Sequence, residues 1–275
     1  MLNGVLVSAD KAVLPATDRA LTHGLGLYET LKLVAGVPAF FAEHLARLQQ
    51  GIDELGLEKP FTDADLAEQI CRLAEAAGVP DGACRLLVTA GPPGGRPNLL
   101  VQVEVRVFPD RPLRVIAYRG VRVSAQFKAM TFLQSYLAQQ AAAKAGADDA
   151  ILVDDEGRIF EGATSNVFIV RGGGLLTTPA EGAILPGVMR AKVEELAGRD
   201  GIPVVEAYAR VADLRPDDAM MLTSSVRGIV SVESVDGRRL RVDGDLVGRL
   251  RSVVAEAEAQ SLAAFRARYS SALSR

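Results

Sequence analysis

The chain has 275 residues, of which 49% are hydrophobic and 24% are charged, and its formal net charge at pH 7 is −3. This composition is typical of a globular protein, and the length is near the point where one core divides into two domains. Acidic and basic residues are interspersed, no stretch reaches the roughly 18 apolar residues of a membrane span, and the N-terminus does not resemble a signal peptide. We therefore expect a cytoplasmic protein that binds neither nucleic acid nor membranes.

The residues that most often bind metals are scarce in this sequence. There are two cysteines, Cys71 and Cys84, and two histidines, His23 and His44, and none of them is spaced like the ligands of a zinc site. We expect the two thiols to be small buried hydrophobic groups and the two histidines to be structural. The sequence predicts no metal centre.

The first part of the chain is predicted to be a small α+β domain, residues 1–113. Strands are expected at residues 1–7 and 27–34. Two amphipathic helices follow, and valines then alternate with polar residues over 101–107, as in a half-buried strand. The apolar faces of the helices consist of Phe41, Leu45, Leu48 and Ile52 in the first, and Leu66, Ile70, Leu73 and Ala77 in the second.

A stretch rich in proline, Phe108 to Pro112, interrupts this pattern. We place an interdomain linker at residues 114–121 and a larger domain at 122–275, and we expect a cofactor cleft between the two domains. The elements predicted for the larger domain are a helix at about 131–145, strands at 150–153 and 166–170, a helix after Pro186 and Gly187, and a long helix from about Asp245 to Ala272.

Only six of the 31 basic residues are lysines, so each lysine can be judged as a covalent catalyst. Lys11 and Lys59 occupy polar turns, Lys144 and Lys192 have helical positions that favour a solvated ammonium, and Lys32 is in a strand. Lys128 follows a polar, strand-like run and precedes an apolar helix, so its amine is expected at the end of an element. By itself, this position is also compatible with a surface lysine.

Six motifs, taken in chain order, resemble those of the fold type IV enzymes that use pyridoxal 5'-phosphate (PLP). That family includes branched-chain aminotransferases, D-amino-acid aminotransferases and 4-amino-4-deoxychorismate lyases. The resemblance covers nearly the whole chain and implies a two-domain α+β fold. The motifs are Asp18-Arg19 with His23 to Thr30, His44 to Leu48, Lys128 with Leu133 and Leu137-Ala138, Glu161 to Phe168, Ile184 to Arg190, and Leu222 to Ser225.

The resemblance implies that Lys128 holds PLP as a Schiff base and moves a proton between the substrate and the cofactor. Glu161 is then expected at the pyridine nitrogen, where a carboxylate keeps the ring protonated and able to accept electrons. Arg47 is placed to bind the cofactor phosphate through its guanidinium fork. Without the resemblance, Arg47 reads as an arginine on a helix surface.

The phosphate is also expected to meet backbone amides at a helix start. The turn from Leu185 to Gly187 leads into a helix, so the amides of Val188 and Met189 can bind an anion at its positive end. By the same resemblance, Ser224 and Ser225 offer hydroxyls and amides to the phosphate.

The substrate side is less sharply defined by the sequence. Tyr28 and Thr30 alternate with Glu29 on a strand, and in the family the face that they share looks into the substrate pocket. Arg96, in a glycine-rich loop, is a candidate for the substrate carboxylate or an exposed loop arginine. The chain departs from many relatives at Thr131 and Phe132, after the lysine.

Three functions remain open at this stage. The first choice is an aminotransferase that acts on a D-amino acid or a branched-chain L-amino acid together with a 2-oxo acid. The second is 4-amino-4-deoxychorismate lyase, which releases 4-aminobenzoate and pyruvate. The third, a binding protein without catalytic activity, is disfavoured because Lys128, Glu161 and Arg47 are all present. The resemblance also implies a homodimer.

Overall fold

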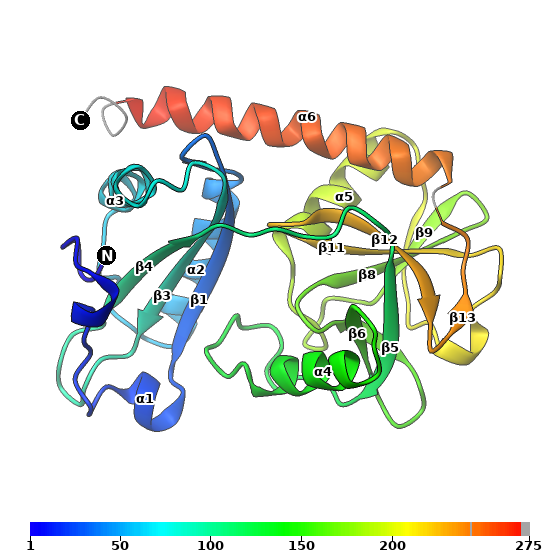
Figure 1. Ribbon diagram of the computed structural model, residues 1–275, viewed down its shortest axis with the longest axis horizontal. Helices are drawn as coiled ribbons and strands as arrows, with labels where there is room; N and C mark the ends of the chain where they lie inside the picture. Colours follow the sequence, from blue (N-terminus) through cyan, green and yellow to red (C-terminus); the bar gives the residue numbers. More distant parts are fainter. Residues whose placement is uncertain (243, 271–275) are drawn as a thin grey trace. The chain divides into compact units, whose positions relative to one another are not determined.

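The computed structural model describes residues 1–242 and 244–270, and the chain divides into two compact units (Figure 1). Unit 1 contains Met1–Val107, Phe127–Thr131 and the chain from Ala257 on. Unit 2 contains Phe108–Gln126 and Phe132–Glu256. The short segment that carries Lys128 thus belongs with unit 1, although unit 2 precedes and follows it in the sequence.

Unit 1 is built on an antiparallel sheet with the strand order β2-β1-β3-β4. Two helices cover it: α2 contacts β1, and α3 contacts β4 (Figure 1). The elements are η1 (Ala9–Lys11), α1 (Arg19–His23), β1 (Gly26–Val34), β2 (Val37–Pro38), α2 (Phe41–Glu54), α3 (Asp63–Ala77), β3 (Gly82–Thr89) and β4 (Leu99–Glu104). The predicted helices and the strand at 27–34 are confirmed.

Strand β1 alternates between a buried and a half-buried face, as its sequence pattern predicts. Leu27, Leu31 and Leu33 are almost completely buried, whereas Tyr28 and Thr30 are half-buried on the opposite face. Burying one leucine side chain contributes about 1.5 to 3 kcal/mol, so this alternation fixes which face of β1 meets the helices.

The strand predicted at residues 1–7 is wrong. Asn3 and Gly4 both have positive φ, and Leu2 and Val5 exchange backbone hydrogen bonds, so the segment is a tight turn with an isolated bridge from Leu2 to Leu100. The Asn-Gly dipeptide favours this left-handed backbone more strongly than the flanking apolar residues favour a strand. The strand predicted at 101–107 instead ends at Glu104, and Val105 and Val107 are exposed.

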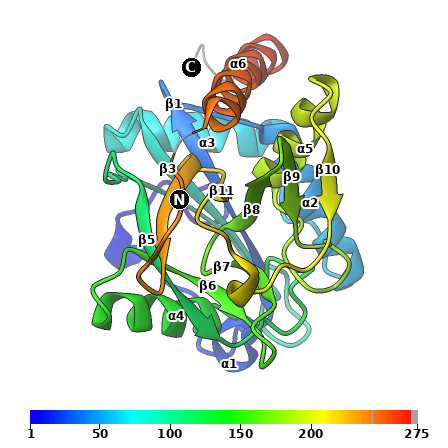
Figure 2. The same cartoon turned by 90° about the vertical axis from the view of Figure 1, so that its right-hand side faces the viewer.

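Within the described residues, unit 2 contains a nine-stranded mixed sheet, which curls into a half-barrel (Figure 2). The strand order is β10-β9-β8-β11-β12-β5-β6-β7, and β13 pairs with β12. The strands are β5 (Leu113–Arg119), β6 (Asp149–Val153), β7 (Ile159–Gly162), β8 (Asn166–Arg171), β9 (Gly174–Thr177), β10 (Val204–Glu206), β11 (Ala219–Ser224), β12 (Gly228–Val235) and β13 (Arg238–Arg239).

Residues 114–121, which the sequence assigned to a linker, lie mostly in β5 of this sheet. Leu113 and Val115 are buried in the core of the half-barrel, and β5 pairs in parallel with β6 and β12. Both prolines, at 109 and 112, lie before β5 begins at Leu113. The interruption of the sequence pattern therefore marks the start of unit 2, and the residues after it are a strand of that unit.

Three helices complete unit 2: α4 (Leu133–Lys144), α5 (Val188–Arg199) and the first half of α6 (Asp245–Arg268). Alanines of α4 pack closely against β6, and α4 also contacts β5 (Figure 2). α5 contacts β10 and β11, and a short 3-10 helix, η2 (Val211–Asp213), precedes β11. These helices are confirmed, although the predicted end of the last one, Ala272, lies outside the described residues.

Candidate active site

The Lys128 segment pairs with the free edge of β1. The Tyr28 amide donates to the Lys128 carbonyl at 2.9 Å, and the Met130 amide donates to the Gly26 carbonyl at 3.0 Å. A Cβ at Gly26 would lie 2.7 Å from the backbone oxygen of Val88 on β3 as well as 2.5 Å from Met130 Sδ, so the strand requires glycine at this position. The pairing sets Lys128 directly across from Tyr28, and Lys128 Nζ lies 4.6 Å from the centroid of the Tyr28 ring. The structure therefore brings the predicted catalytic lysine and a predicted substrate residue together.

The half-buried face of β1 and β3 carries a cation that sequence reasoning missed. Arg85 pairs directly with Thr30, and its guanidinium carbon lies 6.0 Å from the centroid of the Tyr28 ring. Arg85 Nε is buried and has no hydrogen-bond partner within the described residues. The alternation of β3 put Arg85 on the polar face of that strand, but only the register with β1 shows that it lies opposite Thr30.

The structure places Arg96 elsewhere, on the exposed part of the loop between β3 and β4. The base of this loop is firmly held. Asp18 Oδ2 accepts hydrogen bonds from Thr89 Oγ1 at 2.7 Å and from Asn98 Nδ2 at 2.8 Å. Arg19 donates to the Gly91 carbonyl from both its amide and its Nε. The Asp18-Arg19 motif thus has a clear structural role in shaping the loop that carries Arg96.

Arg47 on α2 forms a buried ion pair with Glu29 on β1. Arg47 Nε lies 2.7 Å from Glu29 Oε1, and Arg47 Nη2 lies 2.7 Å from Glu29 Oε2. His44, one helical turn before Arg47, has its Nδ1 2.7 Å from Glu29 Oε2. Glu29 is 1% exposed and His44 is completely buried. Neither the Glu29–Arg47 pair nor the role of Glu29 was predicted from the sequence.

These contacts determine the charges in the cluster. Burial by itself would raise the pKa of Glu29, but the charges and hydrogen bonds of Arg47 and His44 outweigh it and hold that pKa well below its usual value. Burial lowers the pKa of His44; Glu29 opposes this shift, whereas the charges of Arg47 and Lys128 add to it. Glu29 is therefore an anion at neutral pH, and His44 is neutral with its Nδ1–H donating to the carboxylate.

In unit 2, Glu161 on β7 is held by a second arginine. Arg122 donates to Glu161 Oε1 from Nε at 2.7 Å, and Arg122 Nη2 lies 2.6 Å from the same oxygen. The Leu185 amide donates to Glu161 Oε2 at 3.2 Å. Glu161 is 2% exposed, so it is a buried carboxylate with fixed orientation and not a solvated strand residue.

The Leu185 contact joins Glu161 to the start of α5. Asn166 Nδ2 donates to the Leu185 carbonyl at 2.9 Å, and a Cβ at Gly187 would lie 2.0 Å from Asn166 Oδ1. No side chain caps α5, so the first amides of this helix, including those of Val188 and Met189, have no partner within the helix. Such a helix start favours an anion.

Strand β11 lies beside this turn. Thr223 pairs with Asn166 across β8 and β11, and Thr223 Oγ1 is buried without a hydrogen-bond partner in the described part of the chain. Ser224 ends the strand, and Ser225 follows in the turn to β12. An uncapped helix start, a glycine-only approach and an unpaired buried hydroxyl together fit a phosphate-bearing cofactor such as PLP. Among the described residues, no cluster of His, Cys, Asp and Glu could hold a metal ion.

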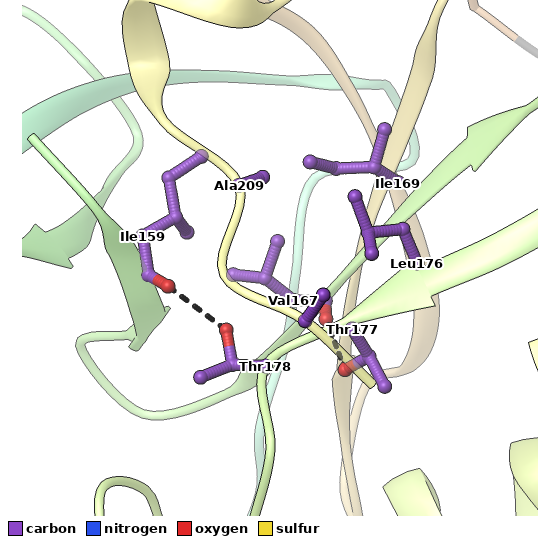
Figure 3. A pocket seen from close by; sticks show the side chains of 8 residues that line it. Ile159, Val167, Ile169, Leu176, Thr177, Thr178 and Ala209 are labelled. Carbon is purple, nitrogen blue, oxygen red and sulfur yellow. Dashed lines mark hydrogen bonds between the residues drawn. The ribbon is translucent and has the colours of Figure 1, made fainter. Parts of the chain in front are cut away.

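A separate small cavity in unit 2 does not fit a substrate. It measures about 10 Å³, enough for about one water molecule, and lies between β7, β8 and β9 (Figure 3). Its two hydroxyls are already engaged, because Thr177 donates to the Val167 carbonyl and Thr178 donates to the Ile159 carbonyl. The other lining side chains are apolar: Ile159, Val167, Ile169, Leu176, Ala207 and Ala209.

Comparison with known proteins extends this description. Residues 26–235 match the model of the class IV amino-transferase family. A Methanocaldococcus jannaschii protein, provisionally named branched-chain-amino-acid aminotransferase, is 30% identical over 252 residues, or 86% of this chain and 88% of that protein. The D-alanine aminotransferase of Bacillus licheniformis is 28% identical over 253 residues, which cover 87% of this chain and 89% of that protein.

Two solved structures are similar to this protein in fold. A hypothetical aminotransferase from Mycobacterium tuberculosis, in its PLP-bound form, has a TM-score of 0.82 and 26% identity, covering 93% of this chain and 96% of that one. A Legionella pneumophila protein, provisionally named 4-amino-4-deoxychorismate lyase, also has a TM-score of 0.82 and 26% identity, covering 91% of this chain and 98% of that one. No helix within the described residues is long and apolar enough to span a membrane.

Proposed function

Because the chain belongs to the class IV aminotransferase family, we propose that it is a PLP-dependent enzyme that transfers an amino group between an amino acid and a 2-oxo acid. The observation that carries this proposal is the pairing of the Lys128 segment with β1, which holds the lysine amine against the Tyr28 ring. The fold is that of the fold type IV enzymes.

When bound, PLP supplies an aldehyde that reacts with amino groups and a pyridinium ring that withdraws electrons from the substrate Cα. Lys128 would hold the cofactor and carry the proton that leaves Cα. Glu161, oriented by Arg122 and the Leu185 amide, would keep a proton on the ring nitrogen. The start of α5, Ser224, Ser225 and Arg47 would hold the phosphate.

For the substrate, we propose a pocket on the half-buried face of β1 and β3. Tyr28, Thr30 and Arg85 share this face, and the unpaired Nε of Arg85 suits a carboxylate of the amino acid or the 2-oxo acid. Arg96 remains a second candidate for this role. As the amino donor we propose a D-amino acid or a branched-chain L-amino acid, because relatives carry the names D-alanine aminotransferase and, provisionally, branched-chain-amino-acid aminotransferase.

The alternative reading is 4-amino-4-deoxychorismate lyase, because one similar structure carries that provisional name. The two activities differ in where the substrate amino group ends. A transaminase leaves it on the cofactor until a 2-oxo acid removes it, whereas a lyase releases it with its product. Both would use Lys128 and Glu161 in the same way, so the residues that hold the cofactor do not distinguish them.

The deciding experiment is to mix the PLP-loaded enzyme with single L- and D-amino acids and to follow the cofactor absorbance. We expect about one equivalent of at least one amino acid to abolish the absorbance band of the bound cofactor. Adding 2-oxoglutarate or pyruvate should restore that band. The chorismate-derived lyase substrate should be assayed alongside for release of pyruvate. If it yields pyruvate while no amino acid bleaches the enzyme, the lyase reading replaces the first choice.

We also propose that the enzyme is a homodimer. Three large apolar side chains of α4 are exposed on one helical face: Leu133 by 67%, Tyr136 by 51% and Leu137 by 41%. An exposed apolar face of this kind is typical of a protein interface. The cytoplasmic location remains a prediction from the sequence.

The oligomeric state can be measured by light scattering after size-exclusion chromatography. We expect the wild type to have twice the chain mass of 29.1 kDa. Leu133→Asp combined with Leu137→Asp should shift it to the monomer mass, whereas Ala76→Asp, on the exposed surface of α3, should not. A wild type that elutes as a monomer would refute the proposal.

A further inference from the structure

Arg190, in the first turn of α5, joins three segments of unit 2. It is 5% exposed, although an arginine is seldom buried unless it is paired. Its Nη1 donates to Glu194 Oε2 at 2.9 Å, one turn along the same helix. Its Nη2 donates to the Thr178 carbonyl at 3.1 Å and lies 3.1 Å from Glu206 Oε1. The buried guanidinium therefore ties the start of α5 to the chain after β9 and to β10.

The Thr178 contact closes the loop that leads into α5. Thr178 and Arg190 are 12 residues apart, and the chain between them contains the turn from Leu185 to Gly187 and the first amides of the helix. Thr178 is itself fixed to the sheet, because its Oγ1 donates to the Ile159 carbonyl on β7 at 2.9 Å. A loop that is already closed in this way has less conformational freedom to lose when it binds a ligand.

The far end of the same loop is also fixed to β7. The Leu185 amide donates to Glu161 Oε2 on that strand at 3.2 Å. Val188 and Met189, whose amides would bind the cofactor phosphate, thus lie between two fixed points of the chain, Leu185 and Arg190. Both points belong to unit 2.

The hydrogen bonds of Arg190 favour the loop over its acidic neighbour. Within the part of the chain that the structure describes, Arg190 Nε and Glu194 Oε1 are buried without a hydrogen-bond partner. An arginine and a carboxylate pair most strongly through two parallel hydrogen bonds, but here Nη2 is directed to the Thr178 carbonyl. Burial raises the pKa of Glu194; Arg190 opposes this shift, whereas the charge of Glu206 adds to it. A cation at position 190 therefore also keeps Glu194 ionised.

We propose that Arg190 is a positioning residue, which closes the loop before α5 and so fixes the first amides of that helix for the cofactor phosphate. This inference rests on the proposed function. Arg190 acts through the backbone that it holds, because its Nη1 and Nη2 already bind Glu194 and Thr178. The effect is selective: a looser loop should weaken the binding of PLP but not that of pyridoxal, which has the same ring and aldehyde but lacks the phosphate.

The test is Arg190→Lys. The lysine keeps a positive charge beside Glu194, but its single terminal nitrogen cannot reproduce the spacing of Nη1 and Nη2. We expect the dissociation constant for PLP to rise about five- to thirtyfold and that for pyridoxal to change less than about twofold. Both constants are measured by equilibrium titration of cofactor absorbance, which does not depend on turnover. Equal weakening of PLP and pyridoxal would show a merely structural role and overturn the inference.

Arg171→Lys is the matched control. Arg171 donates to both carboxylate oxygens of Asp218 and to the Asp213 carbonyl, so it too joins a carboxylate and a backbone oxygen within unit 2. It ends β8, whereas Asn166, which contacts Leu185, begins that strand. The substitution should lower the melting temperature without changing the ratio of the two dissociation constants. A change in that ratio as large as for Arg190→Lys would overturn the inference.

A second variant covers the case in which Arg190→Lys does not fold. Thr178→Val keeps the shape of the side chain but removes the hydroxyl that binds the Ile159 carbonyl, so Arg190 would hold a segment that is less firmly fixed to β7. The selectivity for PLP over pyridoxal should again fall, by at least about threefold. Unchanged or increased selectivity in this variant would overturn the inference.

A double-variant cycle adds the last check. Arg190→Lys and Thr178→Val loosen the same loop, so their effects on the free energy of PLP binding should be less than additive, and full additivity would overturn the inference. A wild type that binds neither cofactor would refute the proposed function along with this inference. A wild type that binds PLP and turns over amino acids, with an Arg190→Lys variant of unchanged selectivity, would refute this inference alone.

Discussion

Replacing Lys128 by alanine should abolish both covalent retention of PLP and turnover, while the fold persists. Lys128 pairs with β1 through its backbone, so the segment stays in place without the side chain. If the lysine both holds the cofactor and moves the proton, kcat should fall by at least about a thousandfold, since a positioned acid–base group alone contributes about 10² to 10⁴. Borohydride reduction followed by peptide mapping identifies the modified lysine.

The control for this variant is Lys144→Ala, at the exposed end of α4. It should retain the wild-type absorbance and rate. Circular dichroism on both variants separates loss of the lysine from loss of the fold. A reduced phosphopyridoxyl group on any lysine other than Lys128 would exclude the assignment.

Replacing Glu161 by glutamine should slow the chemical step but leave the cofactor bound. The Gln side chain keeps the size of Glu161, yet it no longer offers a charge that holds a proton on the ring nitrogen. We expect kcat to fall about 10²- to 10³-fold, as for loss of one preorganised electrostatic contact in other enzymes. The kinetic isotope effect on an α-deuterated amino acid should rise, because removal of the Cα proton becomes limiting.

Glu156→Gln is the control for that experiment. Glu156 is a mostly exposed glutamate in the turn between β6 and β7, close in sequence to Glu161 but paired with Arg158 and Arg210. It should change neither rate nor isotope effect. Loss of the cofactor from Glu161→Gln to the extent seen for Lys128→Ala would contradict separate roles for the two residues.

The local elements of this protein follow from its sequence because their signals are local. Apolar side chains at helical spacing define α2 and α3, and alternation along β1 defines which of its side chains face the core. The motif around Pro186 and Gly187 indicated a helix start able to bind an anion, and α5 begins at Val188 without a side-chain cap. The strand predicted at the N-terminus was wrong because the Asn3-Gly4 turn, also a local signal, was not weighed.

The family resemblance supplied the candidate residues but not the groups that hold them. Glu29 and Arg47 are 18 residues apart, and Arg122 and Glu161 are 39 residues apart. Because the two partners of each pair lie in different elements, no helical or strand periodicity in the sequence indicates that they are in contact. Each depends on how one element packs on another. Arg85 is a similar case, because only the register of β3 against β1 sets it opposite Thr30.

The sequence by itself thus determined the helices, the alternation of β1 and the candidate lysine with its family resemblance, since these rest on residue type and spacing along the chain. The tertiary structure decided the rest. It returned residues 127–131 to the edge of β1, about a hundred residues earlier in the chain, through backbone hydrogen bonds, which do not depend on the type of side chain. It also buried Glu29 and Glu161 beside arginines, because a carboxylate removed from water requires a charged or hydrogen-bonding partner, and only packing decides which partner lies within reach.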